Sequence, residues 1–197
     1  MSVIRSVDVA YGSDTTLKRV EAAAARMGAS VRASRSGDDV TAIAGLDVPD
    51  DAPEWWIEAA ILRALEPSHV LFLCVANSAR SQLAEGLARS LAPEGVKISS
   101  AGSVPTRVRP QAIAALAEIG LDISGHRSTG IDEVERPVDA VITLCAEEVC
   151  PVWLEKAWRL HWGLPDPAGS SDDPDEEMEA FRAVRDELRH RFGVLFG

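Results

Sequence analysis

The sequence predicts an α/β protein in which strands alternate with helices, preceded by a small α+β unit. From residue 69 onward, short apolar runs alternate with stretches of helical period. That alternation is typical of a parallel sheet with helices on both faces. The first part of the chain lacks this repeat and shows short alternating runs between two helical stretches. We therefore predict a small N-terminal α+β domain of unknown role at 1–67 and an α/β domain at 68–197.

The N-terminal unit contains a predicted strand, two helices and a hairpin. Asp14 is a candidate helix cap and Gly28 a candidate stop, which together favour a helix between them. The stretch "APEWWIEAAILRAL" predicts a second helix with Pro53 near its start. We interpret its two tryptophans as core or interdomain packing. In chain order the elements are a strand at 2–12, a helix at 14–28, a hairpin at 29–45 and a helix at 52–65.

The second unit contains four predicted strands separated by helices. The first helix carries leucines at 83, 87 and 91, four residues apart on one face. The second has Pro110 near its start and Gly120 after its end, as expected for a helix. The strands are predicted at 69–74, 96–102, 139–145 and 158–164, and the helices at 81–92, 109–120 and 173–196.

Composition and charge exclude several classes of partner. The chain has 197 residues, 46% of them hydrophobic and 26% charged, which is typical of a globular protein. Its net charge of −11 opposes binding to nucleic acid or to an anionic membrane surface, although local donors can still hold a small anion. The N-terminus lacks the pattern of a signal peptide, and no apolar run approaches the roughly 20 residues of a membrane span. We predict a cytoplasmic protein.

The three cysteines are Cys74, Cys145 and Cys150. An odd number does not suit a set of structural disulfides, and in a reducing compartment cysteines are more often buried, metal-bound or reactive. The four histidines are scattered without the paired spacing of a zinc site. We therefore predict no metal and no cofactor, and expect at least one reactive cysteine.

The stretch "LFLCVANSARSQLAEG" places a cysteine where an apolar strand ends and a helix follows. Backbone N–H groups of such a loop and the helix dipole can hold an anion, and the same field stabilises a thiolate. Arg80 supplies a fork for two oxygens, Ser81 can bond the Cys74 sulfur, and Asn77 tolerates a left-handed turn. The alternative is that Cys74 is only a buried strand residue, but the strand, the helix and Ser81 together favour the functional interpretation. The predicted oxyanion-binding residues are Val75, Ala76, Asn77, Ser78, Ala79, Arg80 and Ser81.

Five segments carry a resemblance to a known family. In chain order, "CVANSARSQLAEG", "SAGS", "LDISGHRS", "VITLC" and "HWGLPDPAG" resemble the low-molecular-weight tyrosine phosphatase superfamily, and its arsenate reductase branch in particular. The resemblance covers residues 69–197 and implies a four-stranded parallel sheet flanked by helices. It implies that Cys74 is the nucleophile, Arg80 binds the oxyanion, Ser81 bonds the thiolate, Asn77 shapes the loop and Asp166 is the general acid.

Two features distinguish the branches of this superfamily. Phosphatases usually carry an aromatic residue soon after the acid, whereas "DPAGSSDD" after Leu164 and Pro165 has none. Arsenate reduction needs two electrons, which thiols supply by forming a disulfide. In the arsenate reductase branch, cysteines matching Cys145 and Cys150 pass the oxidation outward to thioredoxin. The alternative is that these two cysteines are unrelated buried residues.

The chain also departs from the family pattern. Only four residues separate Cys145 from Cys150, and Ala76 replaces a common glycine. Some relatives bind a monovalent cation beside the loop. Asn77, Glu85 and Ser100 match part of that site, whereas Arg127 and Thr129 do not suit the rest, so the residues leave this ion open.

These observations predict an arsenate reductase that works through a thiol–arsenate adduct and an intramolecular disulfide relay. Its partners would be arsenate, with phosphate or sulfate as analogues, and thioredoxin or another thiol reductant. Two alternatives stay open. The first is a phosphatase that hydrolyses phosphomonoesters, and the second is a non-catalytic oxyanion sensor whose N-terminal unit binds a partner.

Overall fold

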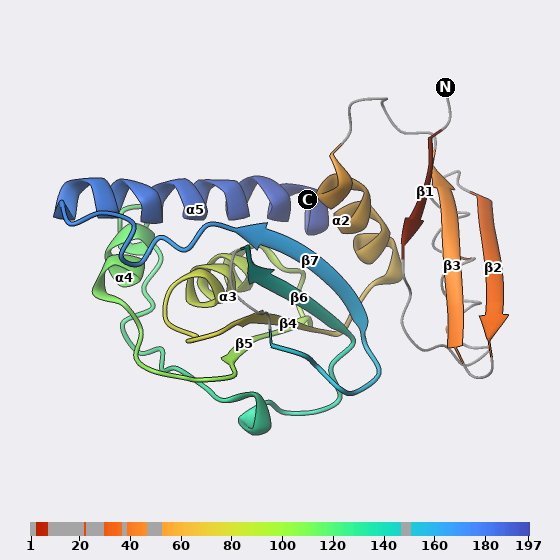
Figure 1. The fold of residues 1–197 in the computed structure, drawn as a ribbon, viewed down its shortest axis with the longest axis horizontal. Helices are drawn as coiled ribbons and strands as arrows, with labels where there is room; N and C mark the ends of the chain where they lie inside the picture. Colours follow the sequence, from red (N-terminus) through yellow and green to blue (C-terminus); the bar gives the residue numbers. More distant parts are fainter. Residues whose placement is uncertain (1–2, 8–21, 23–29, 37–38, 47–52, 147–150) are drawn as a thin grey trace.

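The computed structural model describes residues 3–7, 22, 30–36, 39–46, 53–146 and 151–197 (Figure 1). The predicted helix at 14–28 therefore lies outside the described residues apart from position 22, and Cys150 also lies outside them. None of the described helices is both long enough and apolar enough to cross a membrane.

A four-stranded parallel sheet organises the second unit, as the sequence predicts. Its strands are β4 (His69–Cys74), β5 (Lys97–Gly102), β6 (Ala140–Cys145) and β7 (Trp158–Leu164), in the spatial order β5-β4-β6-β7. All neighbouring pairs are parallel. From β4 the chain continues to β5 at one edge of the sheet, and from β6 it continues to β7 at the other edge. The strand order therefore reverses between β4 and β6, and ligands of open α/β sheets bind outside the carboxyl ends of the strands at such a point.

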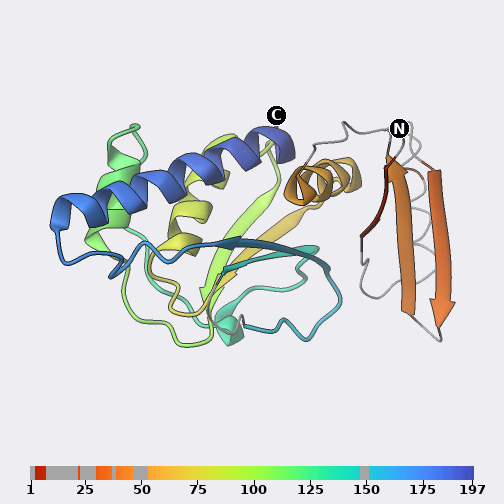
Figure 2. The ribbon, with the colours of Figure 1, turned by 45° about the horizontal axis from the view of Figure 1, so that its top comes forward.

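The helices α3 (Arg80–Leu91), α4 (Pro110–Ala117) and α5 (Pro174–Leu195) cover one face of this sheet (Figure 2). Of the predicted leucine stripe on α3, Leu83 and Leu87 are buried and Leu91 is exposed at the helix end. At the start of α5, Asp173 accepts hydrogen bonds from the N–H groups of Asp175 and Glu176. These helices share one core with Phe72 of β4, Ile142 of β6 and Trp162 of β7.

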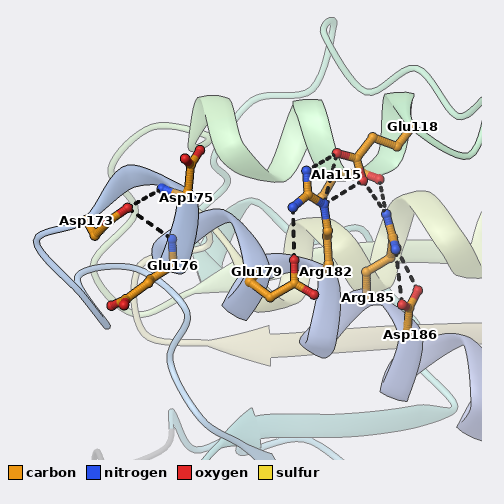
Figure 3. A network of polar contacts seen from close by, with 9 residues as sticks. All are labelled: Ala115, Glu118, Asp173, Asp175, Glu176, Glu179, Arg182, Arg185 and Asp186. Carbon is orange, nitrogen blue, oxygen red and sulfur yellow. Dashed lines mark hydrogen bonds and ion pairs between the residues drawn. The ribbon is translucent and has the colours of Figure 1, made fainter.

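Figure 3 shows how α4 is tied to α5. The carboxylate of Glu118, which follows α4, accepts hydrogen bonds from the guanidinium groups of Arg182 and Arg185 on α5. Arg185 also donates to the carbonyl of Ala115. The two cations lower the pKa of Glu118 to about 2, chiefly through the hydrogen bonds from Arg182. The predicted helices at 109–120 and 173–196 therefore form and are joined by a charged contact at the surface.

The opposite face of the sheet differs from the sequence prediction, which placed helices on both faces. Within the described residues, the segments that pack on that face contain no α-helix. They contain one 3₁₀ turn, η1 (Ile131–Glu133). Pro137 and Pro151 lie in the two connections that cross this face, and proline opposes helix at its own and the preceding position. The apolar cover comes from Val134, Val138, Trp153 and Ala157, which pack on Leu71, Leu73, Ala101 and Val141.

The N-terminal unit contains an antiparallel sheet of β1 (Val3–Val7), β2 (Ser30–Ser36) and β3 (Asp39–Leu46), in the order β1-β3-β2. The pairing of β2 with β3 confirms the predicted hairpin. The predicted strand at 2–12 is described only as far as Val7, and the rest of it lies outside the described residues. Figure 1 shows this sheet beside α2, apart from the four-stranded sheet.

Helix α2 (Glu54–Leu65) packs on the α/β unit, although it precedes the predicted boundary at 67/68. The Trp55 ring meets the His190 ring edge-on at 5.2 Å, and the Arg191 guanidinium lies 5.3 Å from its centre. The boundary itself stays a prediction, and this packing indicates that α2 stabilises the α/β unit. Its buried residues Ala59, Ile61, Leu62 and Leu65 belong to the same core cluster as Trp162 of β7 and Phe192 of α5.

This packing predicts different stabilities for two truncated chains, residues 53–197 and residues 69–197. Full burial of one leucine or isoleucine side chain contributes about 1.5–3 kcal/mol, and α2 buries several. We expect both chains to fold and the shorter one to lose at least about 2 kcal/mol of unfolding free energy. Urea unfolding followed by circular dichroism measures the difference. Equal stabilities would show that α2 contributes nothing to the core of the α/β unit.

Candidate active site

A loop at residues 75–79 joins the end of β4 to the start of α3, as the sequence predicts. Cys74 ends the strand and is only 3% exposed. The segment that follows β5, residues 103–109, binds the loop from one side through three backbone hydrogen bonds. These run from Val104 N to Val75 O (2.9 Å), from Thr106 N to Ala76 O (3.1 Å) and from Arg109 N to Ser78 O (2.9 Å).

These bonds determine where the loop amides point. In a trans peptide, the carbonyl and the next N–H point in opposite directions. The N–H groups of Ala76, Asn77 and Ala79 therefore point away from the 104–109 segment, toward the inner side of the loop. Ala79 is the N-cap of α3 and its side chain makes no capping hydrogen bond. The loop and the helix N-terminus thus present backbone donors to the same space, which is an arrangement that binds anions.

Asn77 fixes the loop conformation. Its φ of 45° is left-handed, as predicted. Its Nδ2 donates to Ser81 Oγ (2.8 Å) and Ser100 Oγ (2.7 Å). Its Oδ1 accepts from Thr129 N (2.7 Å) and Gln82 Nε2 (3.0 Å). The buried side chain of Asn77 therefore uses both ends of its amide to hold the strained turn in place.

Gly102, at the end of β5, allows the loop to lie against the sheet. A Cβ at this position would come within 2.4 Å of Val75 O and 2.8 Å of Asn77 N, both backbone atoms. Only glycine fits such a close approach. Gly102 lies in the segment "SAGS", which resembles the family, and the sequence predicts no role for this glycine. Its contact with the loop depends on the pairing of Cys74 with Gly102 across two strands, which the local sequence does not show.

Ser81 lies against the Cys74 sulfur at 2.9 Å, as the sequence predicts. Because Ser81 Oγ already accepts a hydrogen bond from Asn77 Nδ2, its own hydrogen is available for the sulfur. The hydrogen-bonded chain from Asn77 through Ser81 to Cys74 therefore fixes the position of the sulfur at the start of α3.

The structure also brings the predicted general acid to the predicted anion-binding arginine. Arg80 is 3% exposed, and its Nη1 donates to the carbonyl of Leu164 at the end of β7 (3.1 Å). Its Nη2 bonds Asp166 Oδ2 at 3.0 Å, and the Asp166 side chain is 42% exposed. The guanidinium is therefore anchored by β7, and the carboxyl of Asp166 lies at the open edge of the loop.

Cys145 ends β6, next to β4, so both described cysteines lie at the same edge of the sheet. Cys145 is 1% exposed and neither of the two forms a disulfide. Side chains alternate along a strand, and Phe72 of β4 and Leu144 of β6 both face the helices. Cys74 therefore lies on the helix-covered side, whereas the pairing of β6 with β7 shifts register between Thr143 and Cys145, where Cys145 lies opposite Leu164. The structure thus brings the predicted residues together except Cys145, which lies one strand away, and Cys150, which is outside the described residues.

The residues that match the cation site of some relatives lie together. Ser100 Oγ accepts from Asn77 Nδ2 and donates to Glu85 Oε2 at 2.5 Å. These hydrogen bonds join the residues directly to one another. No group of three or more histidine, cysteine, aspartate or glutamate side chains in the described part of the chain is placed to hold a metal ion.

Residues 69–196 match the family of the low molecular weight phosphotyrosine protein phosphatases. The chain belongs to this family. Among curated members, it is 42% identical over 125 residues to an arsenate reductase of Halalkalibacterium halodurans, covering 62% of this chain and 90% of the relative. It is 38% identical over 130 residues to an arsenate reductase of Bacillus subtilis, covering 64% and 94%.

Solved structures of family members show the same fold. An arsenate reductase in a phosphate-binding state is 38% identical with a TM-score of 0.55, covering 66% of this chain and 96% of that one. An arsenate reductase in an oxidised state is 36% identical with a TM-score of 0.56 and the same coverage. An arginine phosphatase, 22% identical with a TM-score of 0.51, covers 64% of this chain and 92% of that one and shares the fold alone. The N-terminal residues lie outside the matched family region.

Gly102→Ala provides a test of the loop geometry. The added methyl would push the backbone at Val75 and Asn77 and displace the amide donors. We expect sulfate affinity to fall at least tenfold while the fold is retained, because the clash is confined to the loop. Calorimetric titration with sulfate measures this change. Gly193→Ala on α5 is the matched control, since a Cβ there meets nothing within 4 Å. Unchanged sulfate affinity in Gly102→Ala would contradict the assignment of the loop as the anion site.

Proposed function

We propose that this chain is an arsenate reductase that converts arsenate to arsenite through Cys74 and a disulfide relay. The observation that carries the proposal is the second buried cysteine, Cys145, at the end of the strand next to that of Cys74. A phosphatase needs one cysteine and water, whereas reduction needs a second thiol within reach. The arsenate reductases among the relatives support the same function.

The first step is attack of the Cys74 thiolate on arsenate held by the loop amides and Arg80. A sulfur–arsenic bond forms and one oxygen of arsenate leaves as water. Asp166 supplies the proton to that oxygen. Its bond to Arg80 Nη2 supports this role, because an oxyanion bound by the guanidinium would lie beside the carboxyl.

The second step is attack of the Cys145 thiolate on the sulfur of Cys74. A sulfur–sulfur bond forms, and the sulfur–arsenic bond breaks with its electron pair passing to arsenic. Arsenic is reduced from the pentavalent to the trivalent state, and two thiols are oxidised to a disulfide. Cys145 and Cys74 end neighbouring strands, and a disulfide requires Cβ atoms about 3.5–4.5 Å apart. The two strand ends must therefore bring the sulfur atoms together before this bond forms.

The third step transfers the disulfide to the surface. Cys150 displaces Cys74 from Cys145, and thioredoxin or another thiol reductant then reduces the Cys145–Cys150 bond. If the segment between them were helical, their Cα atoms would be roughly 8 to 9 Å apart, beyond the 4.4–6.8 Å of a disulfide. Pro151 disfavours helix at Cys150, which supports a loop. Val152 and Leu154, just beyond, are exposed, as access by a protein reductant requires. The cytoplasmic location stays a prediction.

Arsenite release by Cys74→Ser tests the nucleophile. The variant keeps the loop donors, so we expect sulfate or phosphate binding to be retained. A serine hydroxyl is hardly ionised near neutral pH, so arsenate turnover should fall by at least a thousandfold. Multiple-turnover arsenite release with thioredoxin also separates the alternatives, since a phosphatase or a sensor releases none in the parent chain. Arsenate reduction retained in Cys74→Ser would overturn the proposed function.

Cys150→Ser tests the relay. We expect one turnover per chain and then a stalled Cys74–Cys145 disulfide, because no third thiol resolves it. Peptide mass mapping after a single arsenate pulse identifies the linked peptides, with Cys145→Ser, which should stop before the disulfide, as the matched variant. Full multiple turnover of Cys150→Ser with thioredoxin would leave Cys150 without a role and would favour an external thiol that attacks the Cys74 adduct.

A further inference from the structure

Six side chains form a closed ring of polar contacts behind the anion loop. The ring starts and ends at Asn77, the left-handed residue of the loop. One arm leaves from its Oδ1 and the other from its Nδ2. In order, the members are Asn77, Gln82, His126, Arg89, Glu85 and Ser100.

The orientation of the Gln82 amide is determined by its surroundings. Its Nε2 lies near three oxygens: Asn77 Oδ1 (3.0 Å), Asn77 O (3.2 Å) and Arg127 O (3.1 Å). A flipped amide would place its own oxygen against these acceptors, which is unfavourable. Gln82 is fully buried, so water cannot compensate. Its Oε1 therefore faces His126 as an acceptor.

The tautomer of His126 follows from its two partners. Its Nδ1 lies 2.9 Å from Gln82 Oε1, so Nδ1 carries the hydrogen. Its Nε2 lies 3.2 Å from Arg89 Nη1, and a guanidinium can only donate, so Nε2 carries a lone pair. Both contacts form together only when the ring is neutral with its hydrogen on Nδ1.

The second arm closes the ring through a buried carboxylate. Arg89 forms an ion pair with Glu85 one helical turn earlier on α3. The other oxygen of Glu85 accepts from Ser100 Oγ, which in turn accepts from Asn77 Nδ2. Asn77, Gln82, Glu85 and Ser100 are buried, whereas His126 is partly buried and the Arg89 side chain is 52% exposed. The ring is therefore most exposed to solvent at the pair of His126 and Arg89, and Glu85 and Ser100 line the same cavity.

We propose that His126 is a positioning residue of the anion loop, and that it holds Asn77 in place only as the neutral Nδ1–H tautomer. The proposal rests on the proposed function, since the loop is the arsenate site. A proton on Nε2 would place an N–H against the Arg89 guanidinium and break that link of the ring. The hydrogen bonds from Gln82 and to Ser100 then hold the Asn77 side chain less firmly, and the loop amides lose their alignment.

The charges around His126 set the direction of the pH effect. Burial lowers the pKa of His126 below its ordinary 6.5, with Glu85 opposing the shift and Arg89 adding to it. The stabilisation of Asn77 by the ring is therefore fully present above about pH 6.5, where His126 is neutral. This stabilisation is lost as the pH falls through the lowered pKa of His126. Asp122 faces the imidazole from its own segment, and Lys97, Arg127, Glu133 and Glu135 line the same 350 Å³ cavity with His126.

The tautomer is measured directly in the full wild-type chain. A long-range ¹H–¹⁵N spectrum of histidine-labelled protein at pH 7.5 should show His126 neutral with its hydrogen on Nδ1. His126→Asn assigns the signal. A hydrogen on Nε2, or a charged ring at this pH, would overturn the proposal without any binding measurement.

Sulfate affinity tests the consequence for the loop. The Cys74→Ser background removes titration of the nucleophile, and the charge of sulfate is constant between pH 5.5 and 7.5. We expect affinity to fall as the pH drops below about 6.5, by about fivefold once His126 is fully protonated, as for loss of one hydrogen bond. The amide nitrogen of His126→Asn can replace the Nδ1 donor but removes the acceptor of Arg89 Nη1 and so breaks this link of the ring. This variant should therefore bind about fivefold more weakly at pH 7.5, with no further dependence on pH.

Two arginine variants separate the ring from a general charge effect. Arg89→Met removes the group that opposes protonation of His126 and should abolish the pH dependence. Arg189→Met makes the same charge change on the exposed surface of α5 and should retain it. An unaltered pH dependence in His126→Asn or Arg89→Met would overturn the positioning role. Failure of the Cys74→Ser background to bind sulfate at any pH would instead count against the proposed function.

Discussion

The close contact between the anion loop and Gly102 is the constraint on which the rest of the site depends. The backbone of the loop lies so near β5 that no side chain fits between them. The segment after Gly102 then binds three loop carbonyls and leaves the intervening N–H groups on the inner side. Arg80 and Ser81 follow at the start of α3, so their positions depend on the same contact. Geometry set by backbone contacts needs little rearrangement when an anion binds, and such preorganisation favours both affinity and catalysis.

The parallel sheet explains why Cys74 and Cys145, two residues of the proposed relay, end neighbouring strands although they are far apart in sequence. Parallel strands end at the same edge, and β4 and β6 are neighbours at the point where the strand order reverses. Cys74 and Cys145 therefore meet at one edge. On the face opposite the helices, the described segments contain no α-helix, and their apolar residues pack on β4, β5 and β6.

The ring behind the loop and helix α2 show how residues outside the site support it. The ring consists of polar contacts between mostly buried groups, and a buried polar group without a partner costs free energy. In the proposed ring, the loss of one contact therefore destabilises the conformation of Asn77. Helix α2 uses apolar burial on α5 and β7 instead. Strand β7 also supplies the Leu164 carbonyl that holds Arg80, so the packing of α2 supports the strand that anchors the arginine.

The sequence by itself determined the order of strands and helices in the α/β unit, the loop between Cys74 and α3 and the left-handed Asn77, because these features depend on neighbouring residues. Periodicity, a strand end followed by a helix, and Asn tolerance of positive φ are all local. Family resemblance predicted Asp166 as the general acid, and its contact with Arg80 joins residues 86 positions apart. Only the tertiary structure decided that the described α-helices of the α/β unit cover one face of its sheet, and that the loop lies against Gly102. It also decided that Gln82 and His126 close a ring on Asn77, and that α2 packs on α5. Each of these depends on which distant segments pair or pack, and no local pattern encodes the distance between them.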